Sequence, residues 1–290
     1  MMQKGDFKSL SRALTLVENN LQGSQELLKS IKPNPDIPVI GITGPPGAGK
    51  STLVNALINK LSKAGKYVAV LAIDPTSPFN LGSLLGDRIR MAEQFNKPNV
   101  FIRSLATRGS LGGLSTKTIE MSDVLRAYGF DYILIETVGV GQSEVEIAGL
   151  ADITLVVLVP ESGDEIQGIK SGLMEIADVF VVNKADREGA EAFANNLKKL
   201  SGQKEKSIPV ISTVASKGTG IDELIQLIEE GNSNINPRKG LLLAEKAWNL
   251  ILHQLGAAYD KKKLQQDIAE ASKDKDFNLY QFIEKWTKRS

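Results

Sequence analysis

The chain has 290 residues, of which 42% are hydrophobic and 24% charged, as in an ordinary folded protein. Its 35 basic and 34 acidic side chains leave a formal net charge of +1, so composition predicts no general attraction to nucleic acid or to anionic membranes. The absence of cysteine excludes disulfides and thiolate metal sites, and the single histidine, His253, makes a histidine metal site unexpected. No apolar run is long enough to span a bilayer and no signal-peptide core is present, so we expect a cytoplasmic location without membrane insertion.

The pattern of apolar residues divides the chain into three regions. Residues 1–36 are expected to form an N-terminal helical extension, because Leu10, Leu14, Val17, Leu21 and Leu28 recur near helical spacing up to about residue 32, before a proline-rich linker. Residues 37–231 alternate β-type runs with amphipathic helical stretches, which predicts an α/β fold with a mostly parallel sheet covered by helices on both faces. Residues 232–290 begin as a loop by composition and are expected to form a helical C-terminal arm. The predicted strands are Val39–Thr43, Tyr67–Ile73, Val100–Ser104, Tyr132–Glu136, Thr154–Val159, Val179–Asn183 and Val210–Ser212.

A phosphate-binding loop follows the first predicted strand and precedes a predicted helix. Its sequence GPPGAGKS fits the pattern G-x-x-x-x-G-K-S, in which glycines let backbone amides turn toward phosphate oxygens at a helix N-terminus. We expect Lys50 to reach the β- and γ-phosphates of a nucleotide and the Ser51 hydroxyl to bind Mg²⁺. The predicted nucleotide-binding residues of this loop are Gly44, Pro45, Pro46, Gly47, Ala48, Gly49, Lys50, Ser51 and Thr52.

The base of the nucleotide is predicted by the sequence N-K-A-D at residues 183–186, which follows a buried-looking strand. The Asp186 carboxylate would accept paired hydrogen bonds from guanine N1–H and N2–H₂, a donor pair that adenine lacks. Lys184 is expected to pack along the base, and Asn183 to connect this loop to the phosphate loop. A second loop with Ser216 and Lys217 resembles the S-A-K element that reads guanine O6. GTP and GDP are therefore the predicted ligands.

Two acidic residues at strand ends are candidate Mg²⁺ ligands together with Ser51. Glu136 precedes Thr137-Val138-Gly139 and resembles a D-x-x-G element with Glu in place of Asp. Asp74 ends another predicted strand and precedes a Pro-Thr-Ser turn, although it could also be a turn or helix-capping residue. Val140 stands where many GTPases carry the glutamine that orients water, and Gln142 lies two residues later, so slow basal hydrolysis is expected.

At this point the residues resemble a known family. Residues 136–144, ETVGVGQSE, are similar to the metallochaperone-type branch of P-loop GTPases, whose D-x-x-G element begins with Glu, and the turn at 74–77 is similar as well. Within that branch, the stretches 86–91, 108–114 and 163–170, and the leading helix 11–19, resemble the methylmalonyl-CoA mutase-associated GTPases. The resemblance covers roughly residues 8–260.

The resemblance implies a GTP-hydrolysing chaperone that gates adenosylcobalamin loading and protects or reactivates a cobalamin-dependent acyl-CoA mutase. It implies that Asp74 and Glu136 belong to the metal site, that Asp87 is a switch I acid near the magnesium, and that Asp164–Lys170 meet the mutase. It also implies that residues 232–290 form the dimerisation arm of a homodimer.

The residue that neutralises phosphate charge during hydrolysis is expected among four arginines near the switch regions, Arg88, Arg90, Arg103 and Arg108. We favour Arg108, because nearby glycines at 109, 112 and 113 would let its loop move, and the predicted catalytic set is Lys50, Asp87, Glu136 and Arg108. Asp87, Arg88 and Arg90 could instead form the solvated face of a helix.

Three other functions remain open. A metal-loading GTPase of the same branch is disfavoured by the lack of cysteine. A P-loop small-molecule kinase is disfavoured by the N-K-A-D sequence. A nucleotide-binding scaffold without turnover would need the same phosphate and metal residues, so the sequence does not exclude it.

Overall fold

The computed structural model describes residues 6–74, 92–106, 116–137, 143–161, 173–202 and 207–233, and beyond them residues 240, 244, 247–248, 250–252, 255–256, 259–274 and 277–287. The chain forms two compact units, Met1–Leu242 and Leu243–Ser290. Each is described by itself below.

The first unit is built on a seven-stranded parallel sheet with the strand order β3-β2-β4-β1-β5-β6-β7. This confirms the predicted α/β fold, and the strand ends differ from the predicted ends by two residues at most. Helices cover both faces of the sheet, so most strand residues are apolar. The strands therefore lack the alternation of apolar and polar residues that a sheet with one face in solvent would have. The strands are β1 (Val39–Thr43), β2 (Val68–Asp74), β3 (Val100–Ala106), β4 (Tyr132–Glu136), β5 (Ile153–Leu158), β6 (Val179–Val182) and β7 (Val210–Ser212).

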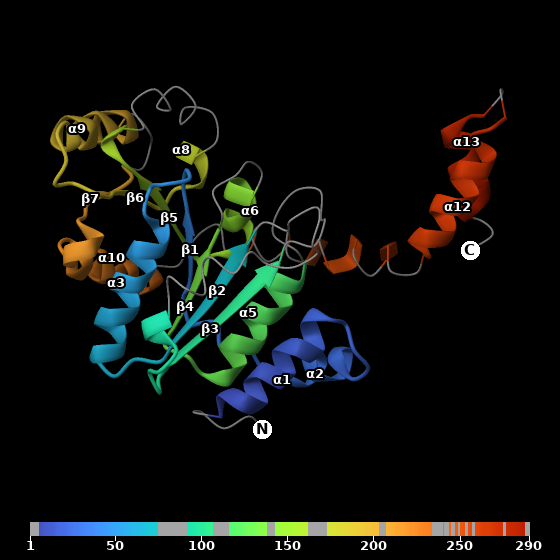
Figure 1. Ribbon diagram of the computed structural model, residues 1–290, viewed down its shortest axis with the longest axis horizontal. Helices are drawn as coiled ribbons and strands as arrows, with labels where there is room; N and C mark the ends of the chain where they lie inside the picture. Colours follow the sequence, from blue (N-terminus) through green and yellow to red (C-terminus); the bar gives the residue numbers. More distant parts are fainter. Residues whose placement is uncertain are drawn as a thin grey trace. The chain divides into compact units, whose positions relative to one another are not determined.

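Alternate residues of each strand enter separate hydrophobic cores on the two faces. On one face α3 (Lys50–Lys63) and α10 (Ile221–Ser233) pack against side chains such as Ile40 and Ile42 of β1. Figure 1 shows these two helices on one side of the sheet, with α1, α2 and α5 on the other. The opposite face is covered by α1 (Phe7–Glu18), α5 (Thr116–Tyr128) and α6 (Ser143–Leu150), and, over β5 to β7, by α8 (Leu173–Ile176) and α9 (Ala190–Ser201). The shorter elements are α2 (Ser24–Ser30) and the 3₁₀ helices η1 (Ala92–Gln94) and η3 (Ala215–Lys217).

The N-terminal region, predicted to be helical up to about residue 32, forms two helices. The chain leaves the helical conformation after Glu18 because Asn20 and Gly23 adopt positive φ angles of 49° and 91°. Leu21, which continued the apolar spacing, lies in this interruption and is 50% exposed. By contrast, Leu10, Leu14 and Val17 of α1 are fully buried in the core with α5 and the sheet. The extension is therefore an integral part of the first unit.

The second unit contains α12 (Lys261–Ala271) and α13 (Leu279–Thr287). Asp260 and Asn278 cap the two helices by accepting hydrogen bonds from backbone amides of the first turn. The indole nitrogen of Trp286 donates a 2.8 Å hydrogen bond to Asp267, and Trp286 also packs against Tyr259 at a centroid distance of 5.6 Å. Neither α12 nor α13 has a buried residue, and Tyr280 is 82% exposed.

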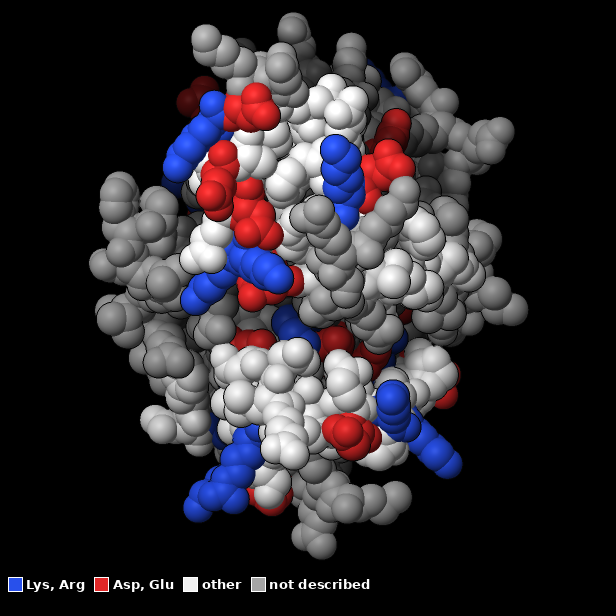
Figure 2. Space-filling view, turned by 90° about the vertical axis from the view of Figure 1, so that its right-hand side faces the viewer, with Lys and Arg blue, Asp and Glu red and all other residues white. Residues whose placement is uncertain are grey.

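Charge and hydropathy of the described residues agree with the composition. On the face seen in Figure 2, basic and acidic side chains are interspersed, as a net charge of +1 leads one to expect. Within the described parts of the chain, no helix has the length and apolar character needed to cross a membrane.

Candidate functional site

The phosphate loop connects the end of β1 to the start of α3. Its glycines Gly44, Gly47 and Gly49 have φ angles of 137°, 78° and 87°. Residues other than glycine rarely adopt such positive values. A Cβ atom on Gly44 would lie 2.0 Å from the carbonyl oxygen of Val157, and one on Gly49 would lie 2.4 Å from Asn183 Nδ2. Both the conformation and the close packing of this loop therefore require glycine.

The Lys50 side chain lies against the same loop. Its Nζ donates hydrogen bonds to the carbonyl oxygens of Gly44, at 2.7 Å, and Pro45, at 3.0 Å, and the residue is buried. Lys50 is also the first residue of α3, whose N-terminal backbone amides favour anions. A buried ammonium group beside a helix N-terminus is the arrangement that binds a polyphosphate.

Ser51 and Glu136 are brought together by the pairing of β1 with β4. Ser51 Oγ donates a hydrogen bond of 2.6 Å to Glu136 Oε1, and Glu136 is buried. Thr137 fixes the end of β4, because its amide donates to the carbonyl of Ile42 at 3.0 Å and its hydroxyl donates to Thr43 Oγ1 at 3.0 Å. A hydroxyl next to a carboxylate is the hard oxygen donor set that Mg²⁺ prefers, so these residues fit the ion.

Asp74, the third predicted metal ligand, ends β2, which pairs with β4 on the side away from β1. Its backbone therefore lies at the same sheet edge as Glu136, where parallel strands present their carboxyl ends. The Asp74 side chain lies outside the described part of the structure.

The base-binding loop is bonded directly to the phosphate loop through Asn183. Its Nδ2 donates to the carbonyl of Ala48 at 3.0 Å, which is the connection expected from the sequence. Its Oδ1 accepts hydrogen bonds from Thr213 Oγ1 at 3.1 Å and from the amide of Ala215 at 3.2 Å. The buried side-chain amide of Asn183 is thus hydrogen-bonded to both neighbouring loops. It links the phosphate loop, the N-K-A-D loop and the loop after β7 into one hydrogen-bonded unit.

A cavity of about 370 Å³ opens among these three loops. This volume is within the range of small-molecule sites. Lys184 has a φ of 56°, unusual for a lysine, and its Nζ donates to the carbonyl of Gly47 at 2.8 Å, so its stem crosses from one loop to the other. The cavity is lined by Gly49, Thr52, Asn183, Lys184, Asp186, Arg187, Val214, Ala215 and Ser216.

Three lining residues were not among the predicted ligands, namely Arg187, Val214 and Ala215. Val214 and Ala215 belong to the predicted base-side loop, residues 213–218, and Arg187 directly follows the N-K-A-D sequence, so their sequence positions were the signal that could have found them. Arg187 forms an ion pair with Glu161, next to the end of β5, and this contact holds the pKa of Glu161 below its usual value.

Asp186, the predicted guanine reader, lines the cavity and is hydrogen-bonded to Lys217, which is also predicted to bind nucleotide. Lys217 Nζ donates to Asp186 Oδ2 at 2.8 Å. This hydrogen bond is the largest of the effects that lower the pKa of Asp186. At neutral pH the carboxylate is therefore ionised and can only accept hydrogen bonds, as recognition of guanine N1–H and N2–H₂ requires.

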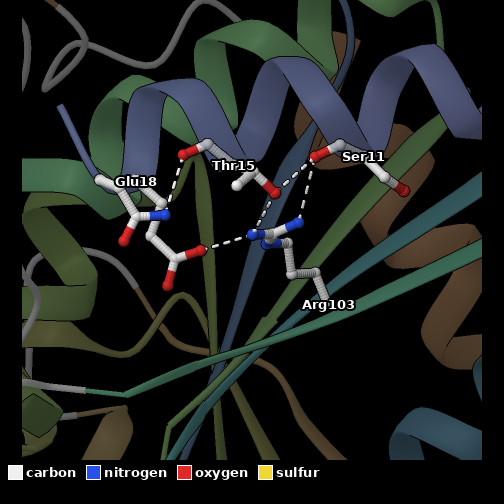
Figure 3. A network of polar contacts seen from close by, with 5 residues as sticks. Ser11, Thr15, Glu18 and Arg103 are labelled. Carbon is white, nitrogen blue, oxygen red and sulfur yellow. Dashed lines mark hydrogen bonds and ion pairs between the residues drawn. The ribbon is translucent and has the colours of Figure 1, made fainter. Parts of the chain in front are cut away.

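Arg103 is not placed to act on a phosphate, which corrects its inclusion among the candidate arginines. Its guanidinium donates to the carbonyl of Ser11 at 3.3 Å, to Thr15 Oγ1 at 3.0 Å and to Glu18 Oε2 at 2.5 Å. Figure 3 shows these partners along one side of α1, with Arg103 reaching them from β3. Its charge is thus used to attach α1 to the sheet.

The other predicted residues lie outside the described residues. They are Asp87, Arg88, Arg90, Arg108, Val140, Gln142, Asp164–Lys170 and His253.

A parallel α/β sheet with a phosphate loop at β1–α3, joined through Asn183 to a guanine-type base loop, defines the class of P-loop GTPases. Comparison with known families then identifies the branch. Residues 10–250 match the model of the family described as methylmalonyl Co-A mutase-associated GTPase MeaB. The chain belongs to this family and is a GTPase, as the motifs predicted.

Individual relatives agree with this assignment. A Pyrococcus abyssi protein named as a GTPase is 53% identical over 237 residues, covering 79% of this chain and 73% of that protein. A Mus musculus protein named methylmalonic aciduria type A homolog, mitochondrial, is 39% identical over 252 residues, covering 78% of this chain and 60% of that protein. Among solved structures, one named LAO/AO transport system kinase superposes with a TM-score of 0.67 at 25% identity, covering 99% of this chain and 94% of that chain.

Proposed function

We propose that this GTPase is a nucleotide-driven chaperone that gates adenosylcobalamin loading and protects or reactivates a cobalamin-dependent acyl-CoA mutase. The observation that carries the proposal is the match of residues 10–250 to the mutase-associated GTPase family. The mouse relative, whose name refers to methylmalonic aciduria, supports the same direction.

The site geometry supports a switch that transmits the state of the phosphates. In this proposal, Lys50 binds the β- and γ-phosphates, and Ser51, Glu136 and Asp74 hold Mg²⁺, which neutralises phosphate charge when bound. Glu136 accepts a hydrogen bond from Ser51 and is itself the first residue of the D-x-x-G element, which continues through Thr137 and Val138 to Gly139. A change at the phosphates therefore has a short covalent path into that region.

Hydrolysis is proposed to be slow until the mutase binds. Val140 takes the place of the usual glutamine, so the chain itself offers no obvious residue there to orient water. In this scheme Asp87 and Arg108 complete the catalytic set, Asp164–Lys170 contact the mutase, and the second unit forms a homodimer.

The alternatives gain no specific support. Metal loading would require a cluster of ligands, and the described residues contain no group of three or more His, Cys, Asp or Glu side chains suited to a metal ion. The solved structure named as a transport system kinase leaves a kinase compatible with the fold, but a kinase that uses ATP has no need of a carboxylate such as Asp186 that accepts the guanine donor pair.

The decisive experiment uses the purified chain with a cobalamin-dependent acyl-CoA mutase from the same cell. GTP hydrolysis is measured with and without the mutase, and transfer of adenosylcobalamin is measured with GTP and with a non-hydrolysable analogue. We expect the mutase to accelerate GTP hydrolysis. We expect the non-hydrolysable analogue to prevent the nucleotide-controlled transfer of adenosylcobalamin, and Lys50→Ala is the inactive control. A mutase that neither binds nor stimulates the chain would refute the chaperone function and leave the GTPase assignment intact.

A further inference from the structure

Lys217 donates a hydrogen bond to Asp186, the side chain of the base cavity that is predicted to read guanine. Its Nζ is 2.8 Å from Asp186 Oδ2, and the two residues come from different loops, one after β7 and the other after β6. The side chain of Lys217 is 65% exposed and that of Asp186 is 44% exposed, so the pair contributes little to the stability of the fold. The effect of this ion pair on the orientation of the Asp186 carboxylate explains it better than a contribution to stability does.

We infer that Lys217 is a specificity-determining residue, which holds the Asp186 carboxylate in the orientation that accepts both guanine donors. A carboxylate has about four acceptor positions on its two oxygens, so one bond from Lys217 leaves room for N1–H and N2–H₂. A bond to one oxygen also restricts rotation of the carboxylate about its Cβ–Cγ bond. Both oxygens can then meet a donor pair at once, whereas a freely rotating carboxylate would satisfy a single donor equally well.

The charged groups around Asp186 single out Lys217 for this role. Among the described residues, Lys217 and Arg187 are the charged side chains that lower the pKa of Asp186, and Arg187 and Lys184 lower the pKa of Glu161. Arg187 is paired with Glu161, and Lys184 donates to the carbonyl of Gly47. Lys217 is the cation whose hydrogen bond contributes most to holding the pKa of Asp186 below its usual value.

This inference rests on the cavity being the guanine site, and it is independent of the mutase. Removing Lys217 has one consequence that a general loss of structure would not have. GDP should lose more affinity than inosine diphosphate, because inosine lacks the 2-amino donor and offers Asp186 only N1–H.

The test is calorimetric titration of the full chain with GDP and with inosine diphosphate at about pH 7.5. We expect Lys217→Met to weaken GDP binding about two- to fivefold, and inosine diphosphate binding less.

Two further variants complete the design. Lys217→Arg keeps a cationic donor and should behave as wild type, and Lys198→Met removes an exposed positive charge from α9 and should have no effect. Equal losses for the two nucleotides, or a GDP affinity in Lys217→Met equal to wild type, would overturn the inference. Circular dichroism melting of each variant shows whether the fold is retained, and Lys217→Gln serves as a second neutral variant with the same expected difference between the two nucleotides.

Discussion

Ser51 Oγ donates a 2.6 Å hydrogen bond to Glu136 Oε1 across 85 residues of sequence. The bond joins the start of α3, where phosphates are expected, to the end of β4. Because both side chains offer hard oxygen atoms, this pair is the part of the site best suited to Mg²⁺.

Glu136→Gln tests the metal role of this pair, since it keeps the size of the side chain and removes its charge. We expect the Mg²⁺ concentration for half-maximal GTP hydrolysis to rise about tenfold or more, with GDP affinity in the absence of Mg²⁺ nearly unchanged. A Mg²⁺ titration of steady-state hydrolysis measures both. Glu223→Gln, at an exposed position of α10, is the matched control. An unaltered Mg²⁺ dependence in Glu136→Gln would contradict the assignment.

The close packing of the phosphate loop predicts different effects for two of its glycines. Gly49→Ala and Gly47→Ala both impose a positive φ on alanine, at a cost of about 1–3 kcal/mol in the free energy of unfolding. Only Gly49→Ala also places a Cβ 2.4 Å from Asn183 Nδ2, because nothing lies within 4 Å of a Cβ on Gly47. We expect the Gly49 variant to be the less stable in urea and to lose more GDP affinity. Equal behaviour of the two variants would show that the contact with Asn183 does not matter.

Asp186→Asn tests the choice of base. The amide replaces one acceptor by a donor, so GTP affinity should fall by at least about tenfold, and xanthosine triphosphate, which carries an oxygen at position 2, should bind more tightly than to wild type. Competition titrations with both nucleotides and with ATP give the answer. Wild-type protein that binds ATP as tightly as GTP would refute guanine recognition.

The attachment of α1 through Arg103 predicts a stability effect without a catalytic one. In a double-mutant cycle of Arg103→Met and Glu18→Gln, measured by urea unfolding, we expect a coupling energy of about 1 kcal/mol, since both side chains are largely buried. Basal GTP hydrolysis per folded molecule should remain at the wild-type rate. If Arg103→Met instead abolished hydrolysis at unchanged stability, the arginine would have to act on the phosphates after all.

The second unit predicts self-association. Its helices α12 and α13 have no buried residues, yet Leu279, Tyr280 and Ile283 are exposed apolar side chains. Helices of this kind usually bury such a face against a partner, and a symmetric dimer is the commonest solution. Light scattering should show a dimer for the full chain and a monomer for a chain ending at Leu242, with GDP affinity retained. A monomeric full chain at micromolar concentration would count against it.

The sequence predicts those parts of this protein in which local chemistry decides the structure. The strands were predictable because burial on both faces demands continuous apolar runs, and the phosphate loop because its glycines are required at fixed spacing. The partners of Arg103 and Lys217 were not predictable. Arg103 lies 85 residues from Glu18 and Lys217 lies 31 residues from Asp186, so only the folded sheet brings these side chains together and no local pattern encodes the contacts.

The order of the elements along the chain has a consequence for biosynthesis. The apolar side of α1 is translated well before α5, whose Met121 and Val124 cover it in the finished core. At usual ribosomal rates the delay is on the order of ten seconds. During that time Leu10, Leu14 and Val17 form an exposed apolar surface on the nascent chain, to which holdase chaperones can bind. The completed molecule no longer offers this surface, because all three residues are buried.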